Sequence, residues 1–426
     1  MQVLTGVILP LLLLAAGAWF AVTVGRRLIR HPRRCLAAMG GKEKGSALRA
    51  LSVALAGTLG VGNIAGVATA IVLGGAGAIF WMWISACLAM FLKYAEIVLA
   101  MRYRQLDASG NPHGGAMYYI KVALGGRGGK VLAAVFAILC FCCSVTLGGV
   151  IQSSAAAEAM AVAFDLPPLL IGGVMGVLAA VILARGSERI EQACAALVPF
   201  VCLLFSIAAV AVLILRREAL PAAFAAIFKG AWNWNSCGAG ALGFFTSRAL
   251  RYGVARGLVS NEAGCGTAPI AHAAAKAKSP AAQGLWGIFE VFIDTVLLCT
   301  MTALVILTSG VPLVGEGGTA LAIAAFSAVL GPVASPVLAL SVLFFAFATV
   351  LCWSHYGAEC LLYLTGKAQT VKWMLLTVLL SCTVGAVAAP GILWELTDVI
   401  IALMALLNIT ALLLLRRTVA EETKHL

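Results

Sequence analysis

Long apolar runs, separated by short segments rich in charges, prolines or glycines, recur along almost the whole chain. Each run is long enough to cross the hydrocarbon of a bilayer, which takes about 20 residues in a helix. Backbone amides in lipid must be paired within their own segment, so these runs must be helical. The pattern predicts an all-α integral membrane protein with about eleven transmembrane helices. The predicted spans lie near residues 4–25, 48–75, 78–100, 130–162, 167–185, 192–215, 245–276, 284–309, 334–363, 372–389 and 393–415.

The composition also favours a lipid environment. Of the 426 residues, 62% are hydrophobic and 11% are charged, whereas soluble proteins carry about 25% charged residues. The net charge of +12 would suit a nucleic-acid binder, but the basic residues stand between the apolar runs rather than on one face or tail. We therefore expect the lipid bilayer as a partner and no nucleic acid. The CxxC of Cys140 and Cys143 lies in an apolar run without the polar neighbours of a metal or redox site, so it is interpreted as inert.

The positions of lysine and arginine predict the orientation, because cytoplasmic loops carry an excess of both. The run at 4–25 lacks a basic segment before it, so we interpret it as a retained first span rather than a signal peptide. With the N-terminus outside, every loop expected in the cytoplasm contains Lys or Arg, and the C-terminus is cytoplasmic. These segments are 26–49, 102–130, 185–189, 276–283, 367–372 and the tail from 416.

Two predicted spans contain residues that disrupt a transmembrane helix. The second span has a glycine-rich stretch at 57–66, and the seventh has a glutamate, two glycines and a proline shortly after residue 260. Irregular backbone at membrane depth is tolerated only where it is buried in protein or lines a cavity. Interrupted helices in matching positions of two halves indicate a transporter site. We therefore predict two discontinuous helices, broken at 57–66 and 260–266.

Several longer motifs resemble the alanine/glycine:cation symporter family, whose members are also called sodium:alanine symporters. They run in order over most of the chain. The motifs are GNIAGVATAI at 62–71, GGAGAIFWMW at 74–83, KYAE at 93–96, GGAMYY at 114–119, RGLVSNEAG at 256–264, FIDT at 292–295 and WSHYG at 353–357.

The resemblance implies one transporter domain with a LeuT-like core of five plus five helices in inverted repeat. An extra helix would occupy 1–30, the two repeats 48–217 and 240–417, and a cytoplasmic tail 418–426. It further implies sodium-driven uptake of alanine or glycine across the cell membrane, which in bacteria is the inner membrane. No enzymatic activity and no organic cofactor are expected.

The breaks supply the candidate substrate site, because interrupted helices present free N–H groups to a carboxylate and free carbonyls to an ammonium or sodium ion. Gln152 is a polar interruption that could contact substrate or a neighbouring helix, and the bulk of Trp353 could exclude larger side chains. The predicted substrate-binding residues are Gly60, Gly62, Asn63, Gln152, Val259, Ser260, Asn261, Gly264 and Trp353.

Sodium requires hard oxygen ligands, and the resemblance places a site at Thr349 together with the carbonyls of Ala56, Leu59 and Phe345. Family members commonly carry a Ser-Thr pair at the position of Thr349, whereas this chain has Ala348 before it, so one hydroxyl is missing.

The intramembrane carboxylates leave alternatives open. Glu262 could cap unwound backbone or bind an ion, and Asp294 could serve an ion site, a proton relay or a pairing with Lys93. Because Asp294 and His355 could both carry protons, proton coupling is the alternative to sodium coupling. A second alternative is an amino-acid sensor that does not transport. The preferred amino acid, the stoichiometry and the oligomeric state stay open.

Overall fold

The computed structural model describes residues 8–40, 44–108, 110–232, 247–313, 318–388 and 391–426. Within these ranges the chain is helical apart from turns and one short antiparallel pair, in which Gln105 stands opposite His113. The beginnings of the spans predicted at 4 and 245, and of the second repeat predicted at 240, lie outside the described residues.

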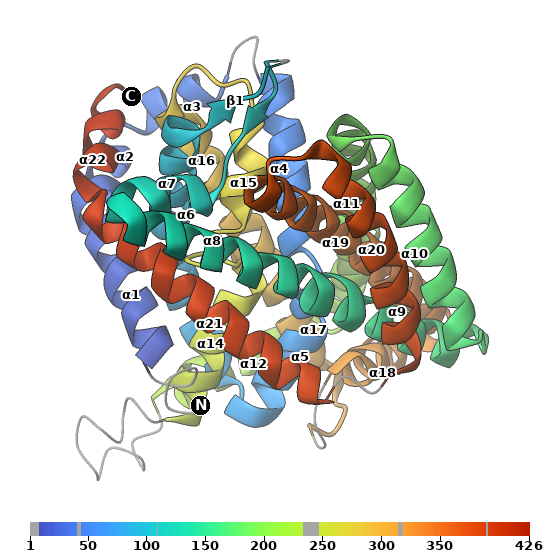
Figure 1. The fold of residues 1–426 in the computed structure, drawn as a ribbon. Helices are drawn as coiled ribbons and strands as arrows, with labels where there is room; N and C mark the ends of the chain where they lie inside the picture. Colours follow the sequence, from blue (N-terminus) through green and yellow to red (C-terminus); the bar gives the residue numbers. More distant parts are fainter. Residues whose placement is uncertain (1–7, 41–43, 109, 233–246, 314–317, 389–390) are drawn as a thin grey trace.

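The helices follow the predicted order of apolar runs (Figure 1). In the first half they are α1 (Leu9–Phe20), η2 (Ala21–Gly25), α2 (Arg26–Arg30), α3 (Pro32–Met39), α4 (Lys44–Thr58), η3 (Val61–Asn63), α5 (Ala65–Gly74), α6 (Gly77–Tyr103), α7 (Ala116–Leu124), α8 (Gly126–Cys143), η4 (Ser144–Ile151), α9 (Gln152–Phe164), α10 (Pro168–Ala184), α11 (Ser187–Leu215), η5 (Arg217–Ala219) and α12 (Leu220–Ala231). The strands β1 (Gln105–Leu106) and β2 (Pro112–His113) stand between α6 and α7.

The second half contains the other broken helix and the long helix that crosses the bundle beside it. Its elements are α14 (Arg248–Asn261), α15 (Ala268–Ala273), α16 (Pro280–Val291), η7 (Phe292–Cys299), α17 (Thr300–Ser309), α18 (Gly318–Leu330), η8 (Gly331–Val333), α19 (Ala334–Thr365), η9 (Ala368–Thr370), α20 (Val371–Val387), α21 (Gly391–Leu414) and α22 (Arg416–Lys424).

Seven helices among the described residues are long and apolar enough to cross a membrane, or eight if a bent pair is counted as one span. That pair joins Lys44–Thr58 to Val61–Gly74 at an angle of 63°. Two shorter apolar helices, Pro168–Ala184 and Lys372–Val387, occupy the places of two further predicted spans. A multi-pass membrane protein is therefore confirmed, whereas the number eleven and the inverted repeat stay predictions.

Helices α6 and α19 form the centre of the bundle. Helix α6 packs against α14, α15 and α16, and α19 packs against α4, α8, α9 and α11. Helices α10 and α20 lie together at one side, and α8 runs beside α21 across the front of the view in Figure 1. Both broken helices thus lie against the two central helices, which positions the breaks inside protein.

The pattern of apolar runs did not predict several shorter helices. Helices α7, α12 and α18 occupy stretches assigned to loops, and the predicted tail at 418–426 lies mostly in α22. This tail packs on α6, where Thr423 Oγ1 lies 3.0 Å from Tyr94 Oη and Glu422 lies 3.3 Å from the Arg102 guanidinium. These helices are short, so their hydrophobic pattern does not resemble a span.

Candidate functional site

The first break frees two backbone carbonyls. Helix α4 ends at Thr58, and Gly60 adopts an extended conformation before η3. The N–H of Gly60 donates to Thr58 O, and the N–H of Asn63 donates to Gly60 O. In a continuous helix these two N–H groups would pair with the carbonyls of Ala56 and Leu59. The break therefore releases the two carbonyls expected to face sodium.

Side chains from two other helices approach this break. The N–H of Val61 donates to Gln152 Oε1 over 3.3 Å, and Gln152 begins α9 directly after the π-helical η4. A Cβ atom added to Gly60 would lie 2.9 Å from Thr349 Oγ1 and 3.1 Å from Gln152 Oε1. The Thr349 hydroxyl donates to Phe345 O over 3.0 Å, leaving its lone pairs free to accept or to bind a cation.

The second break is an irregular segment between α14 and α15. Glu262 has φ = 52°, and Gly264 and Gly266 have φ of 88° and 80°. Left-handed backbone is costly for most side chains but not for glycine, which explains the two glycines. Asn261 supports the turn by accepting the N–H of Ala263 over 3.0 Å.

Glu262 spans this second break with its own side chain. Its carboxylate accepts the Thr267 hydroxyl over 2.7 Å. Capping of a backbone N–H was one of the roles considered for Glu262. In the structure Glu96 of α6 has this role, because it accepts the N–H of Gly266 over 3.0 Å. The Asn408 amide of α21 donates to the same Glu96 carboxylate and, over 2.8 Å, to Gly264 O.

Asp294 joins the two breaks. It lies in the π-helical η7 and is fully buried. Asn63 Nδ2 of the first break donates to Asp294 Oδ1 over 2.6 Å, and Ser260 Oγ of the second donates to Oδ2 over 2.8 Å. The hydroxyl of Thr295 adds a third bond of 2.6 Å to Oδ2. Its three side-chain donors are neutral, and Asn63 Oδ1, also buried, has no hydrogen-bond partner.

The breaks also touch each other directly. A Cβ atom added to Gly62 would meet Ser260 Cα at 3.9 Å. Asn261 Nδ2 donates to Thr295 Oγ1 over 3.2 Å, so both residues predicted at 260 and 261 face η7. Asp294 could be identified from the sequence as a carboxylate within an apolar run. Nothing in the sequence pointed to Thr295 as a partner of both Asp294 and Asn261.

The possible pairing of Asp294 with Lys93 is wrong. Lys93 Nζ lies 3.2 Å from Glu290 Oε1, and His272 Nε2 lies 3.1 Å from the other oxygen of Glu290. Gln283 completes this group through a 2.7 Å contact with His272 Nδ1. Lys93 is fully buried within α6, so its ammonium is held inside the protein. Removing either partner of such a buried ion pair would strongly destabilise the protein, because the other charge would stay buried without compensation.

Trp353 lines a small cavity at the second break. Its ring lies in the interior, and a Cβ added to Gly148 would meet Trp353 Cβ at 2.3 Å. Together with Val259, Glu262 and Thr267 it lines a cavity of about 10 Å³. A space of that size holds no more than about one water molecule. Asn63 and Asn261 face η7 instead, so the predicted residues form two adjoining groups.

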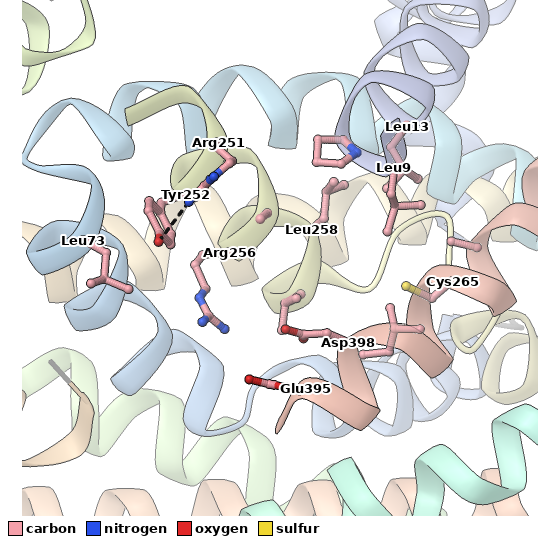
Figure 2. A pocket seen from close by; sticks show the side chains of 15 residues that line it. Leu9, Leu13, Leu73, Arg251, Tyr252, Arg256, Leu258, Cys265, Glu395 and Asp398 are labelled. Carbon is pink, nitrogen blue, oxygen red and sulfur yellow. Dashed lines mark hydrogen bonds between the residues drawn. The ribbon is translucent and has the colours of Figure 1, made fainter. Parts of the chain in front are cut away.

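A larger cavity opens beside the small one. It has a volume of about 380 Å³ and lies between α1, α5, α14 and α21 (Figure 2). Val259, Cys265 and Ile401 line both cavities. The two cavities therefore adjoin each other at the second break. The ring of His355 lies beside the ring of Tyr356 and makes no hydrogen bond with the described residues.

Comparison with known proteins identifies the family. The model of the sodium:alanine symporter family matches residues 1–426. The sodium/alanine symporter AgcS of Methanococcus maripaludis is 40% identical over 89% of this chain and 83% of its own length. An uncharacterised transporter of Haemophilus influenzae is 38% identical over 97% of this chain and 92% of its own.

Solved structures show the same fold at low sequence identity. MhsT in complex with L-phenylalanine, a transporter of the LeuT fold, has a TM-score of 0.58 and 16% identity over 88% of this chain and 91% of its own. The family model covers the whole sequence, and the two broken helices meet at a buried carboxylate. This chain belongs to the sodium:alanine symporter family.

Proposed function

We propose that this protein is a sodium-coupled symporter that imports small neutral amino acids, alanine or glycine among them, by alternating access. The proposed architecture is the LeuT-like inverted repeat of five plus five helices, with 1–30 as an extra helix, 48–217 and 240–417 as the repeats and 418–426 as a cytoplasmic tail. The protein resides in the cell membrane with its N-terminus outside. Family membership supports sodium-coupled amino-acid symport, and the positions of lysine and arginine support the orientation.

The observation that carries the proposal is the position of Asp294 between the breaks. Its buried carboxylate receives hydrogen bonds from Asn63 and Ser260, and no cationic side chain neutralises it among the residues bonded to it. An uncompensated charge in the interior is costly. A sodium ion would supply the missing charge, and the unpartnered Oδ1 of Asn63 would supply a further ligand.

A second sodium position is proposed at the first break. The freed carbonyls of Ala56 and Leu59 and the Phe345–Thr349 pair form a set of hard oxygen ligands. The alanine at 348 removes one hydroxyl from this set, so we expect weaker sodium binding here than a Ser-Thr pair would give.

The amino acid is proposed to lie between the two groups of site residues. The first break, with Gly60, Gly62 and Asn63, and the side-chain amide of Gln152 would receive its carboxylate, and Val259, Ser260, Asn261 and Gly264 would form the opposite wall. The large ring of Trp353 and the small adjoining cavity favour a short side chain. Ion and substrate bound together would stabilise the occluded state, which is the linkage that couples their movement.

Purified protein in liposomes tests this proposal. Uptake of labelled alanine and glycine is measured with an inward sodium gradient, with a pH gradient alone, and with neither. We expect uptake to be driven by sodium and to be abolished by Asp294→Asn. The control Asp165→Asn, which changes an exposed aspartate at the end of α9, should leave uptake intact.

Other outcomes would identify the alternatives. Uptake that follows the pH gradient and ignores sodium would establish proton coupling in place of sodium. Alanine binding without uptake or counterflow would indicate a sensor. Sodium-driven uptake that survives Asp294→Asn would remove Asp294 from the ion site.

A further inference from the structure

Charged side chains from two helices line the 380 Å³ cavity. Arg256 of α14 and Glu395 and Asp398 of α21 line it, and Figure 2 shows their charged ends extending toward the same space. These three side chains form no hydrogen bond or ion pair with the described residues. Charged groups that line a cavity without partners are available to a ligand.

A second arginine on the same wall behaves differently. The guanidinium of Arg251 lies 4.9 Å from the centre of the Tyr252 ring and donates to the Tyr252 hydroxyl over 3.2 Å. Arg251 is therefore held by its neighbour, whereas Arg256 lines the cavity and forms no hydrogen bond or ion pair in the part of the chain that the structure describes.

The sizes of the two cavities decide which of them can hold an amino acid in this conformation. The inner one, beside Trp353, measures about 10 Å³ and holds at most about one water molecule. The outer one, about 380 Å³, falls in the range of roughly 300–1,000 Å³ typical of small-molecule sites. Arg256 lies about one helical turn before Val259, which lines both cavities.

We propose that this cavity is a separate binding site for a zwitterionic amino acid, occupied before the inner site opens. The Arg256 guanidinium binds the carboxylate, and Asp398 and Glu395 bind the ammonium group. The identity of the ligand class rests on the proposed function, but the site itself rests on the arrangement of these charges.

The charge pattern also gives the site a preference. A guanidinium offers a carboxylate two parallel hydrogen bonds, and two carboxylates facing it attract one ammonium group. A second carboxylate on the ligand would meet Glu395 or Asp398 as a like charge, which disfavours it. Neutral zwitterions are therefore selected before they reach the inner site, and dicarboxylic amino acids are disfavoured.

The test separates this site from the inner one by using Asp294→Asn as the background. Binding of labelled alanine to the full-length purified protein is measured by equilibrium dialysis at millimolar concentrations. We expect weak binding that persists in Asp294→Asn and falls roughly tenfold or more when Arg256→Gln is added, since a hydrogen bond to a charged group is lost. Arg251→Gln, the matched loss of one positive charge from the same wall, should change it less than about twofold.

Competitors test the zwitterion requirement in the same background. Unlabelled glycine should displace labelled alanine, whereas propionate, which lacks the ammonium, and alanine methyl ester, which lacks the carboxylate, should displace it poorly. Equal loss with Arg251→Gln and Arg256→Gln, equal competition by propionate, or no binding to Asp294→Asn would each overturn the proposal.

The outcome is independent of the proposed transport function. Failure of the wild-type protein to take up alanine with sodium would contradict symport, while the dialysis experiment would still decide the outer site. If Asp294→Asn does not fold, bound alanine per chain is counted in the wild-type background. The number of alanine molecules bound per chain should then fall from two in the wild type to one in Arg256→Gln. An unchanged number would contradict the proposal.

Discussion

Gly60→Ala should disable the protein by filling the space between the first break and its two partners. The added Cβ would lie 2.9 Å from Thr349 Oγ1 and 3.1 and 3.3 Å from the two polar atoms of the Gln152 amide. The backbone angles of Gly60, φ = −117° and ψ = −158°, are accessible to alanine, so the effect is one of contact and not of backbone strain. Displacing these groups also breaks the bond from Val61 to Gln152.

The size of the effect follows from two terms. Overpacking of a close-packed interior costs about 1–3 kcal/mol, and loss of one buried hydrogen bond adds about 1 kcal/mol. A penalty of about 2–4 kcal/mol on the competent conformation corresponds to a fall of roughly 30-fold to several hundred-fold in its population. Sodium-driven uptake of labelled alanine should therefore fall by at least about tenfold.

The matched control is Gly66→Ala, six residues away in the same broken helix. A Cβ at Gly66 would meet no atom within 4 Å, and alanine favours helix over glycine by about 1 kcal/mol. The added methyl group should therefore change the free energy of the competent conformation by less than about 0.4 kcal/mol, so that uptake stays within about twofold of wild type. Wild-type uptake by Gly60→Ala, or equal loss in both variants, would refute the reasoning. Thermal unfolding in detergent shows whether either protein has merely lost its fold.

Three further changes test other contacts. Ala348→Ser should restore a hydroxyl beside Thr349 and lower the sodium concentration for half-maximal uptake by roughly tenfold; an unchanged sodium dependence would remove this position from the ion site. Burial of Lys93 against Glu290 predicts that Lys93→Met lowers stability by about 3–5 kcal/mol and that adding Glu290→Gln recovers part of it, measured as the thermal unfolding midpoint; no recovery would contradict the pairing. The hydrogen bond that His113 donates to the Glu359 carboxylate raises the pKa of His113 to about 9 from its ordinary value of 6.5. The stability from this contact is therefore complete below pH 6.5 and is lost as the pH rises through 9. Glu359→Gln should therefore lower the unfolding midpoint at pH 6 more than at pH 10, and an equal effect at both would argue against a charged His113.

The breaks were predictable because their causes are local in sequence. Glycines at 57–66 and a charge with two glycines and a proline after 260 disfavour helix wherever they occur, and the first helix bends by 63° within the predicted stretch. The backbone then releases the carbonyls of Ala56 and Leu59, as expected for ligands at such a break.

The partners of the buried charges could not be predicted in this way. Asp294 and Glu290 lie one turn apart, and the sequence leaves open which of them faces Lys93. The path of η7 decides it, because the two carboxylates enter different parts of the interior. Glu96 was equally ambiguous, since its position in α6 gives no sign that it receives the N–H of Gly266 from a segment 170 residues away.

The charges on α14 have a consequence for how the protein enters the membrane. This helix carries three arginines at 248, 251 and 256 and is not among the described helices apolar enough to span a bilayer by themselves. An arginine at the centre of an isolated helix costs about 2.5–3.5 kcal/mol on insertion scales. Helix α14 packs along α6, which is synthesised earlier. Its insertion should therefore depend on the first half of the chain being already in place, so a fragment that begins after α12 is expected to leave α14 outside the bilayer.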